Sequence, residues 1–185
     1  MRLFIAINLT ENMKEALSET VAELRAAARR GRYTRPENLH LTLVFIGESN
    51  RIDDILDVME EAAERAFTEP VKLALTDAGA FRGRGGDLHW IGIENTPELK
   101  SLVKALEAGL RAAGFEIEKR RFLPHITIAR EVVVSGIPGD IAITIRPASM
   151  MAGHISLMRS ERVDGRQVYT EIASVFCCKD SCENG

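Results

Sequence analysis

Two short stretches of the chain alternate polar and apolar side chains in the same phase. In HLTL, leucines follow His40 and Thr42, and in HITI, isoleucines follow His125 and Thr127. Successive side chains of a β-strand point to opposite faces of the sheet, so each stretch places its histidine and threonine on one face. The pattern predicts two strands that each present an imidazole and a hydroxyl on a polar face.

The rest of the chain divides into helix-like and strand-like periodicities. Apolar residues spaced three and four apart predict helices, and short apolar or alternating runs predict strands. Besides the two His-x-Thr stretches, we expect strands at 2–9, 71–81 and 88–94, two to three more within 141–161 and 167–175, and helices at 11–30, 52–67 and 97–113. Thr10 and Thr96 are placed to cap helices, and Gly31 and Gly114 to end them. The sequence RGRGGD at 82–87 predicts a hairpin turn or a long mobile loop.

Helices alternate with strands in the first half of this order, and strands accumulate in the second half. This order is typical of an α+β fold with two sheets and helices on their outer faces. If the two His-x-Thr stretches arose by duplication, the halves are related lobes whose signature strands face each other across a groove. No GxGxxG or GxxxxGK[ST] sequence supports a dinucleotide or P-loop site.

Composition narrows the class of protein. The 185 residues are 45% hydrophobic and 28% charged, as in an ordinary globular protein. A net charge of −3 argues against a general nucleic-acid coat protein but leaves room for a local basic pocket. The apolar run at the N-terminus is too brief for a signal sequence, and no run reaches the length of a membrane span. We expect a cytoplasmic protein with no membrane partner.

All three cysteines lie near the end of the chain, at Cys177, Cys178 and Cys182. No histidine accompanies them, and a structural metal site usually needs four ligands. We expect free thiols in a reducing compartment.

The doubled pattern suits acid and base chemistry on a phosphate. Histidine has an unperturbed pKa near neutrality, so one imidazole can act as a base while the other acts as an acid. Threonine hydroxyls are compact donors to anionic oxygens. Each His-x-Thr strand offers only one good metal ligand, and no HExxH sequence accompanies it. We therefore expect His40, His125, Thr42 and Thr127 to form a metal-free site for phosphodiester cleavage.

Arg130 follows the second His-x-Thr stretch and is a candidate phosphate contact. Strict alternation would turn its side chain to the face opposite Thr127, unless the strand ends or bulges there.

The sequences RLFIAINL, PENLHLTLVFIG and FLPHITIAR resemble the two-histidine (HxTx) phosphoesterase superfamily. Within it, they are most similar to the RNA 2',3'-cyclic phosphodiesterases, also called 2'-5' RNA ligases. The resemblance runs from residue 2 to about residue 175. It implies a bilobal α+β fold with two pseudo-symmetric antiparallel sheets, a central cleft, one phosphoesterase domain over 1–176 and a C-terminal tail at 177–185.

The resemblance also implies an activity. Similar enzymes are hydrolases of RNA processing that open 2',3'-cyclic phosphate RNA ends to 2'-phosphates without a metal or cofactor, and they can join certain tRNA halves in reverse. Carried onto this chain, His125 is the base that activates water and His40 the acid that protonates the 3' oxygen. Thr42 and Thr127 hold the non-bridging phosphate oxygens, and Arg130 assists. The partner is then RNA with cyclic phosphate ends, including tRNA halves, and we expect a monomer.

Two positions depart from the family pattern. Tyr33 stands where the family often has tryptophan, and His89 is inserted between Leu88 and Trp90 in the central hairpin. Trp90 fits a core position, with stacking on a nucleobase as the alternative. His154 lacks a threonine two residues later and is expected to be structural.

Basic clusters precede both signature strands. They comprise Arg29, Arg30, Arg32 and Arg35, and then Lys119, Arg120 and Arg121. Such runs are commonly solvated faces, but their matched placement also fits a positive rim that steers RNA to the site.

Other functions remain open from the sequence. The same chemistry could act on a small cyclic nucleotide or on an ADP-ribose cyclic phosphate. A non-catalytic module that binds RNA ends would keep the phosphate pocket without turnover. The third alternative is a metal-binding protein, which would contain stoichiometric zinc.

Overall fold

We describe a computed structural model of the chain over residues 1–119, 121–134 and 144–177. The helices are α1 (Glu11–Ala27), η1 (Pro36–Asn38, a single 3-10 turn), α2 (Ile52–Ala66) and α3 (Pro97–Ala112). The strands are β1 (Arg2–Asn8), β2 (Ala28–Tyr33), β3 (His40–Glu48), β4 (Val71–Phe81), β5 (Asp87–Ile93), β6 (His125–Val134), β7 (Ser149–Ala152), β8 (His154–Val163) and β9 (Arg166–Phe176).

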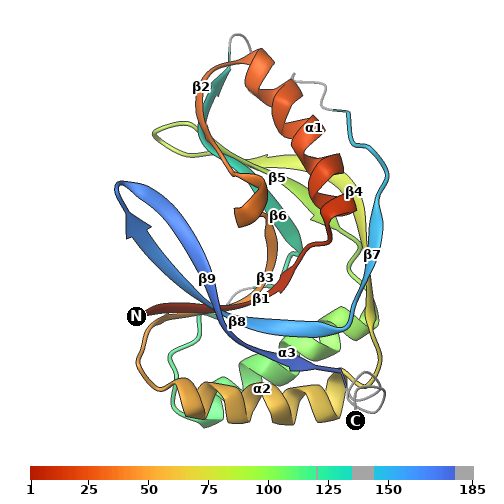
Figure 1. The fold of residues 1–185 in the computed structure, drawn as a ribbon, viewed down its shortest axis with the longest axis vertical. Coiled ribbons are helices and arrows are strands. Elements are labelled where there is room, and N and C mark those ends of the chain that lie inside the picture. Colours follow the sequence, from red (N-terminus) through yellow and green to blue (C-terminus); the bar gives the residue numbers. More distant parts are fainter. Residues whose placement is uncertain (120, 135–143, 178–185) are drawn as a thin grey trace.

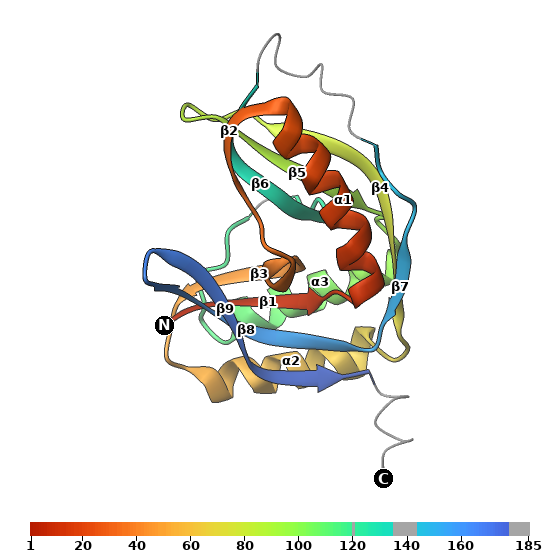
Figure 2. The same ribbon diagram turned by 45° about the horizontal axis from the view of Figure 1, so that its top comes forward.

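Within the described residues, these strands form two antiparallel sheets, as expected for the α+β class. One sheet has four strands in the order β3-β1-β8-β9, and the other has five in the order β2-β6-β5-β4-β7. Helix α1 packs on β2 and β6, whereas α2 and α3 pack on each other and on β9 and β3. Figures 1 and 2 show the resulting arrangement, with α1 covering the five-stranded sheet and α2 and α3 lying below the four-stranded one. We call these two layers the four-stranded lobe and the five-stranded lobe.

The lobes do not correspond to the two halves of the sequence. The four-stranded sheet takes β1 and β3 from the start of the chain and β8 and β9 from its end, while the strands between them build most of the other sheet. The condition that each half of the chain forms one lobe is therefore not met, although the two signature strands do lie in different lobes. Strand pairing across the sheet, rather than order in the chain, decides which lobe a segment joins.

The core follows the apolar periodicity of the sequence. Leu99, Leu102, Val103, Leu106 and Leu110 of α3 are all buried, as their spacing predicts. Helices α2 and α3 approach closely at Gly109, where an added Cβ would lie 2.7 Å from Val58 Cγ1. Glycine is therefore needed at this crossing, despite its low helix propensity.

The first helix is shorter than the sequence suggests. It ends at Ala27, and the following residues form β2, in which Ala28 pairs with Val134 and Tyr33 with Ala129 of β6. Backbone groups that a longer helix would satisfy internally are instead satisfied in the sheet, and this pairing overrides a weak helix propensity.

The two expected N-caps differ in the structure. Thr96 Oγ1 accepts a hydrogen bond from Leu99 N at 3.2 Å and so caps α3. Thr10 has the extended backbone of an N-cap, but its side chain makes no capping bond. The hydroxyl contributes to the start of one helix and not to the other.

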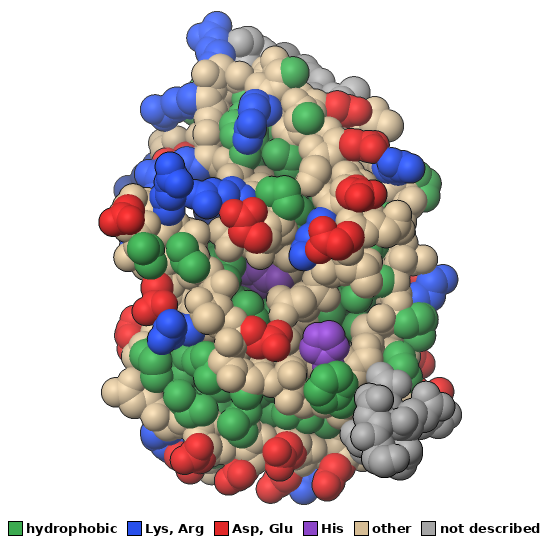
Figure 3. Space-filling view, viewed as in Figure 1, with side chains coloured by type: hydrophobic (Ala, Val, Ile, Leu, Met, Phe, Trp, Pro, Cys, Tyr) green, Lys and Arg blue, Asp and Glu red, His purple; other side chains and the backbone are tan. Residues whose placement is uncertain are grey.

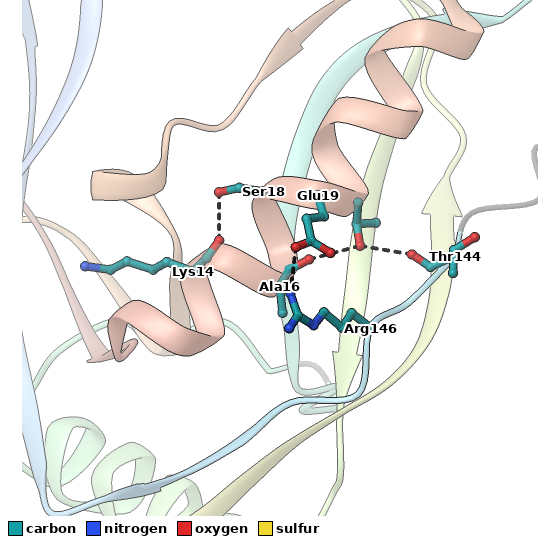
Figure 4. Close-up of polar contacts among 7 residues, drawn as sticks. Lys14, Ala16, Ser18, Glu19, Thr144 and Arg146 are labelled. Atoms are coloured by element: carbon teal, nitrogen blue, oxygen red, sulfur yellow. Dashed lines mark hydrogen bonds and ion pairs between the residues drawn. The ribbon is translucent and has the colours of Figure 1, made fainter.

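Residues 144–148 cross the surface of α1 before β7 begins (Figure 4). Thr20 Oγ1 donates to the carbonyl of Thr144 at 3.1 Å, and Arg146 pairs with Glu19 at 2.6 Å. These contacts hold residues 144–146 against the helix that covers the same sheet.

Candidate active site

The two His-x-Thr stretches open strands of different sheets. His40 and Thr42 lie on β3 in the four-stranded sheet, and His125 and Thr127 lie on β6 in the five-stranded sheet. Strands β3 and β6 contact each other where the lobes meet. All four side chains are partly exposed, while the residues that follow them on both strands are buried. The alternation predicted from the sequence is therefore present on both strands.

In each motif, the carbonyl group two residues before the histidine fixes the same tautomer of the imidazole. Nδ1 of His40 lies 2.8 Å from the carbonyl oxygen of Asn38, and Nδ1 of His125 lies 2.8 Å from that of Leu123. A carbonyl can only accept, so Nδ1 carries the proton in both rings. Nε2 is left as the nitrogen that can take up or give a proton in each neutral imidazole.

The two motifs differ in what Nε2 contacts. His40 Nε2 lies 2.9 Å from Thr42 Oγ1. Because Nε2 of the neutral ring is an acceptor, the hydroxyl of Thr42 donates to it. Among the described residues, no corresponding bond joins His125 to Thr127. The hydroxyl proton of Thr42 is therefore engaged by His40 in the free site.

Burial lowers the pKa of His40 below its ordinary value, because the charged imidazolium loses its hydration. The carbonyl of Asn38 acts in the opposite direction by accepting the Nδ1 proton. Arg130 and His125 act electrostatically to lower the pKa further. His125 and Arg130 therefore act electrostatically on the first motif, and His40 is neutral in the free site at neutral pH.

Arg130 reaches this region because β6 bulges. Thr127 pairs with Trp90 of β5, but Ala129 pairs with the neighbouring His89, so β6 has one extra residue at this point. An extra residue reverses the alternation, which brings Arg130 to the face of Thr127. A second irregularity follows at Glu131, whose φ is 54°. The sequence alone did not decide whether the strand bulges before Arg130, and the structure shows that it does.

Aromatic rings flank both histidines. The rings of Phe4 and Tyr169 lie 4.9 and 5.0 Å from that of His40, and those of Phe81 and Trp90 lie 5.7 and 6.1 Å from that of His125. Trp90 was the only one of the four that sequence reasoning singled out. The others come from strands β1, β4 and β9, which the sheet register brings beside the motifs.

The segment between β2 and β3 joins the lobes beside the site. Thr34 Oγ1 donates to the carbonyl of Thr127 at 2.9 Å, and Asn38 Nδ2 donates to the carbonyl of Gln167 in β9 at 3.0 Å. The same Asn38 supplies the carbonyl that orients His40. These bonds fix the segment before β3 against both sheets.

The other sequence candidates lie away from this constellation or contribute less to it. His154 opens β8, with its ring 5.4 Å from that of Phe176. His89 is half-buried, and burial lowers its pKa. Lys119 and Arg121 are exposed, whereas Arg120 lies outside the described residues.

Metal clusters and membrane helices are both absent from the part of the chain that the structure describes. No group of three or more histidine, cysteine, aspartate or glutamate side chains there is arranged to hold a metal ion. No helix in the same residues is long and apolar enough to cross a membrane. Cys177 is buried, and the remaining cysteines fall outside the described ranges.

Charge is unevenly distributed around the site. Figure 3 shows a histidine side chain recessed near the centre of one face. Lysine and arginine side chains gather above it and to its left, over the five-stranded lobe, and acidic side chains lie above it, to its right and along the lower edge.

Known proteins resemble this chain in sequence and in fold. Residues 13–164 match the model of the 2'-5' RNA ligase superfamily. An RNA 2',3'-cyclic phosphodiesterase of Methanothermobacter thermautotrophicus is 28% identical, over 93% of this chain and 96% of the relative. The crystal structure of TT0787 of Thermus thermophilus superposes with a TM-score of 0.81 at 27% identity, over 96% of this chain and 98% of that one.

A second solved structure, E. coli LigT complexed with 3'-AMP, gives a TM-score of 0.71 at 29% identity, over 95% of this chain and 97% of that one. The family match covers most of the chain and includes both His-x-Thr strands. The chain therefore belongs to the 2'-5' RNA ligase superfamily.

Proposed function

We propose that this protein hydrolyses RNA 2',3'-cyclic phosphate ends to 2'-phosphates without a metal ion. The observation that carries the proposal is the pair of histidines on facing sheets, each with Nδ1 bonded to a carbonyl and Nε2 left for proton transfer. The superfamily match and the name of the relative support the reaction class. The 3'-AMP in the LigT complex supports a site of nucleotide size.

The reaction requires one base and one acid. In the direction of hydrolysis, His125 Nε2 takes a proton from water as the water oxygen bonds to phosphorus. The bond from phosphorus to the 3' oxygen breaks, and His40 Nε2 gives its proton to that oxygen. The products are a 2'-phosphate and a free 3'-hydroxyl. When the 5'-hydroxyl of a second RNA end takes the place of water, its oxygen bonds to phosphorus, the 3' oxygen leaves in the same way, and the product is a 2'-5' linkage between RNA ends such as tRNA halves.

Because His40 is neutral in the free site, we expect substrate binding to change its pKa as well as to place the phosphate. A phosphate anion offsets the charge of Arg130, which is one cause of the lowered pKa of His40. The pKa of His40 is therefore raised by substrate binding, which favours the protonated ring that must deliver a proton. Once Nε2 is protonated it no longer accepts from Thr42, so the hydroxyl of Thr42 is released to donate to a phosphate oxygen.

Thr127 and Arg130 complete the proposed phosphate site. Thr127 makes no competing bond to His125 among the described residues, so its hydroxyl can donate to the phosphate from the start. Arg130 adds a positive charge on the same face of β6 after the bulge. Both contribute donors aimed at oxygens that gain charge in the transition state.

We also propose that residues 1–176 act as one monomeric unit in the cytoplasm. One buried apolar cluster includes residues of both lobes, such as Leu41 of β3 and Ile126 of β6, which supports a single unit.

The test is to incubate the purified protein, in excess chelator, with an RNA oligonucleotide that ends in a 2',3'-cyclic phosphate. We expect a product with a 2'-phosphate. A cyclic mononucleotide and an ADP-ribose cyclic phosphate are assayed in parallel. Turnover of the small substrates alone would favour the small-molecule alternative, and tight binding of the RNA without turnover would favour an end-binding module.

A further inference from the structure

We infer that the RNA strand leading to the cyclic phosphate lies along the five-stranded lobe, across the β4–β5 loop and strand β2. The terminal base lies against Phe81, and the phosphates that precede it contact Arg82 and Arg84. This inference rests on the proposed function, because it assigns a path to the substrate of that same site.

Phe81 marks the beginning of the path. Its side chain is 43% exposed although its ring lies only 5.7 Å from that of His125. The ring also packs 5.6 Å from Trp90, which lies so close over β4 that a Cβ at Gly79 would be 2.2 Å from it. An exposed, supported aromatic ring next to a reacting group is a surface on which any base can stack.

The loop that follows Phe81 contains two positively charged residues next to the site. Arg82 and Arg84 are exposed, and neither has an ion pair with a carboxylate in the part of the chain that the structure describes. They are one and three residues from Phe81, so their Cα atoms lie within about 11 Å of its Cα even if the chain is fully extended. Both guanidinium groups are therefore available to nearby phosphates.

The loop is held in place despite its three glycines. Gly83 N donates to Asp87 Oδ1 at 3.3 Å, and Gly86 N donates to the carbonyl of Gly83 at 3.2 Å. Arg30 of β2 donates to the carbonyl of Gly85 at 3.1 Å and ties the tip to the edge strand of the sheet. The loop and β2 thus form one surface, so the phosphate contacts are partly organised before RNA binds.

Strand β2 extends the charge. Arg29 and Arg30 are exposed on this edge strand, whereas the charge of Arg32 is offset by Glu131 at 3.1 Å. Figure 3 shows the blue side chains gathered on this lobe. A track of cations beside an aromatic ring is the combination that binds single-stranded nucleic acid without sequence preference.

The hairpin of the opposite lobe lacks this bias. Its tip, between β8 and β9, carries Arg162 and Arg166 but also Glu161 and Asp164. Residues 161–166 thus carry two positive and two negative charges, whereas residues 82–87 carry two positive charges and one negative charge, that of Asp87. Charge thus favours the β4–β5 side, although both hairpins lie near a histidine and present two arginines.

The test compares two double variants with the same change of charge, R82Q/R84Q on the proposed path and R162Q/R166Q on the other hairpin. For each, kcat/KM is measured with an RNA oligonucleotide and with a mononucleotide that bear the same 2',3'-cyclic phosphate end. We expect the ratio of oligonucleotide to mononucleotide kcat/KM to fall about tenfold at 0.1 M salt for R82Q/R84Q, because two phosphate contacts are lost. For R162Q/R166Q the ratio should stay at the wild-type value.

Salt dependence gives an independent readout. The slope of log kcat/KM against log salt for the oligonucleotide should become shallower by about 1.4 in R82Q/R84Q, at about 0.7 per phosphate contact with a single strand. A wild-type ratio and slope in R82Q/R84Q, or an equal loss in R162Q/R166Q, would overturn the proposed path. Failure of the wild-type protein to open either substrate would instead overturn the proposed function.

Discussion

His40 Nε2 lies 2.9 Å from Thr42 Oγ1, whereas no such bond joins His125 to Thr127 among the described residues. The two motifs are alike in sequence but not in their hydrogen bonds. The threonine hydroxyl of the first motif donates to its own histidine, and that of the second is left for other acceptors. This difference separates the two threonines in function and can be measured.

Replacement of Thr42 by valine removes a hydroxyl that we expect to donate to the phosphate in the transition state. The predicted loss in kcat is about a hundredfold, the scale for one such donor. Steady-state kinetics with the cyclic phosphate RNA measures it. Thr42→Ser keeps the hydroxyl and serves as the control, with activity within a few-fold of wild type expected. Equal losses in the serine and valine variants would point to packing rather than to the hydroxyl.

Arg130→Gln removes one of the charges that lower the pKa of His40. The pKa of His40 should therefore be higher in this variant than in the wild type, because the imidazolium no longer faces that cation. An NMR titration of the histidine ring signals tests this prediction. Arg65→Gln is the matched control, since Arg65 lies on α2, pairs with Glu61 and is not a cause of the shift. An unchanged or lower pKa in Arg130→Gln would contradict the electrostatic account.

The lowered pKa of His40 also predicts a pH dependence of stability. The unfolded chain binds a proton at the ordinary pKa of about 6.5, whereas the folded chain binds it only at lower pH. Unfolding is therefore favoured as the pH falls through 6.5 toward the folded pKa, and above this window the His40 contribution is constant.

The measurement is the free energy of unfolding by urea between pH 7.5 and pH 5, for the wild type and for His40→Gln. The wild type should lose more stability on acidification than the variant does. His89, whose pKa is also lowered, is present in both proteins, so its contribution cancels from the difference. Parallel curves would show that His40 does not titrate as described.

Gly86 is predicted to be essential for the junction of the β4–β5 loop with the bulged part of β6. Its φ is 122°, and an added Cβ would lie 2.6 Å from the carbonyl carbon of Glu131. Gly86→Ala should therefore lower the free energy of unfolding by about 2 kcal/mol. The neighbouring Gly85, which has open space where a Cβ would lie, is the control, and Gly85→Ala should cost much less. Equal effects of the two substitutions in urea denaturation would refute this role.

The alternation in the sequence is sufficient to predict both signature strands and their polar faces. It also predicts helix α3, because its apolar spacing, its Thr96 cap and its Pro97 all agree. Local signals of this kind depend on neighbouring residues alone. They are reliable where burial follows the same period as the secondary structure.

Features set by strand pairing could not be predicted in the same way. Strand β2 follows a helix-forming sequence and exists because it pairs with β6. The bulge that turns Arg130 toward the site depends on the register between β5 and β6. Phe4 and Tyr169 reach His40 from strands at opposite ends of the chain, so no spacing in the sequence predicts these ring contacts.

The acid and base pair is tested by single-turnover hydrolysis of the cyclic phosphate RNA by the wild type, His40→Ala and His125→Ala, in excess chelator. We predict that each substitution lowers the rate by about two to four orders of magnitude, as expected for loss of a general acid or base. Circular dichroism should show that both variants remain folded. Folded variants that both turn over at the wild-type rate would contradict the assignment of His40 and His125 as the acid and base pair.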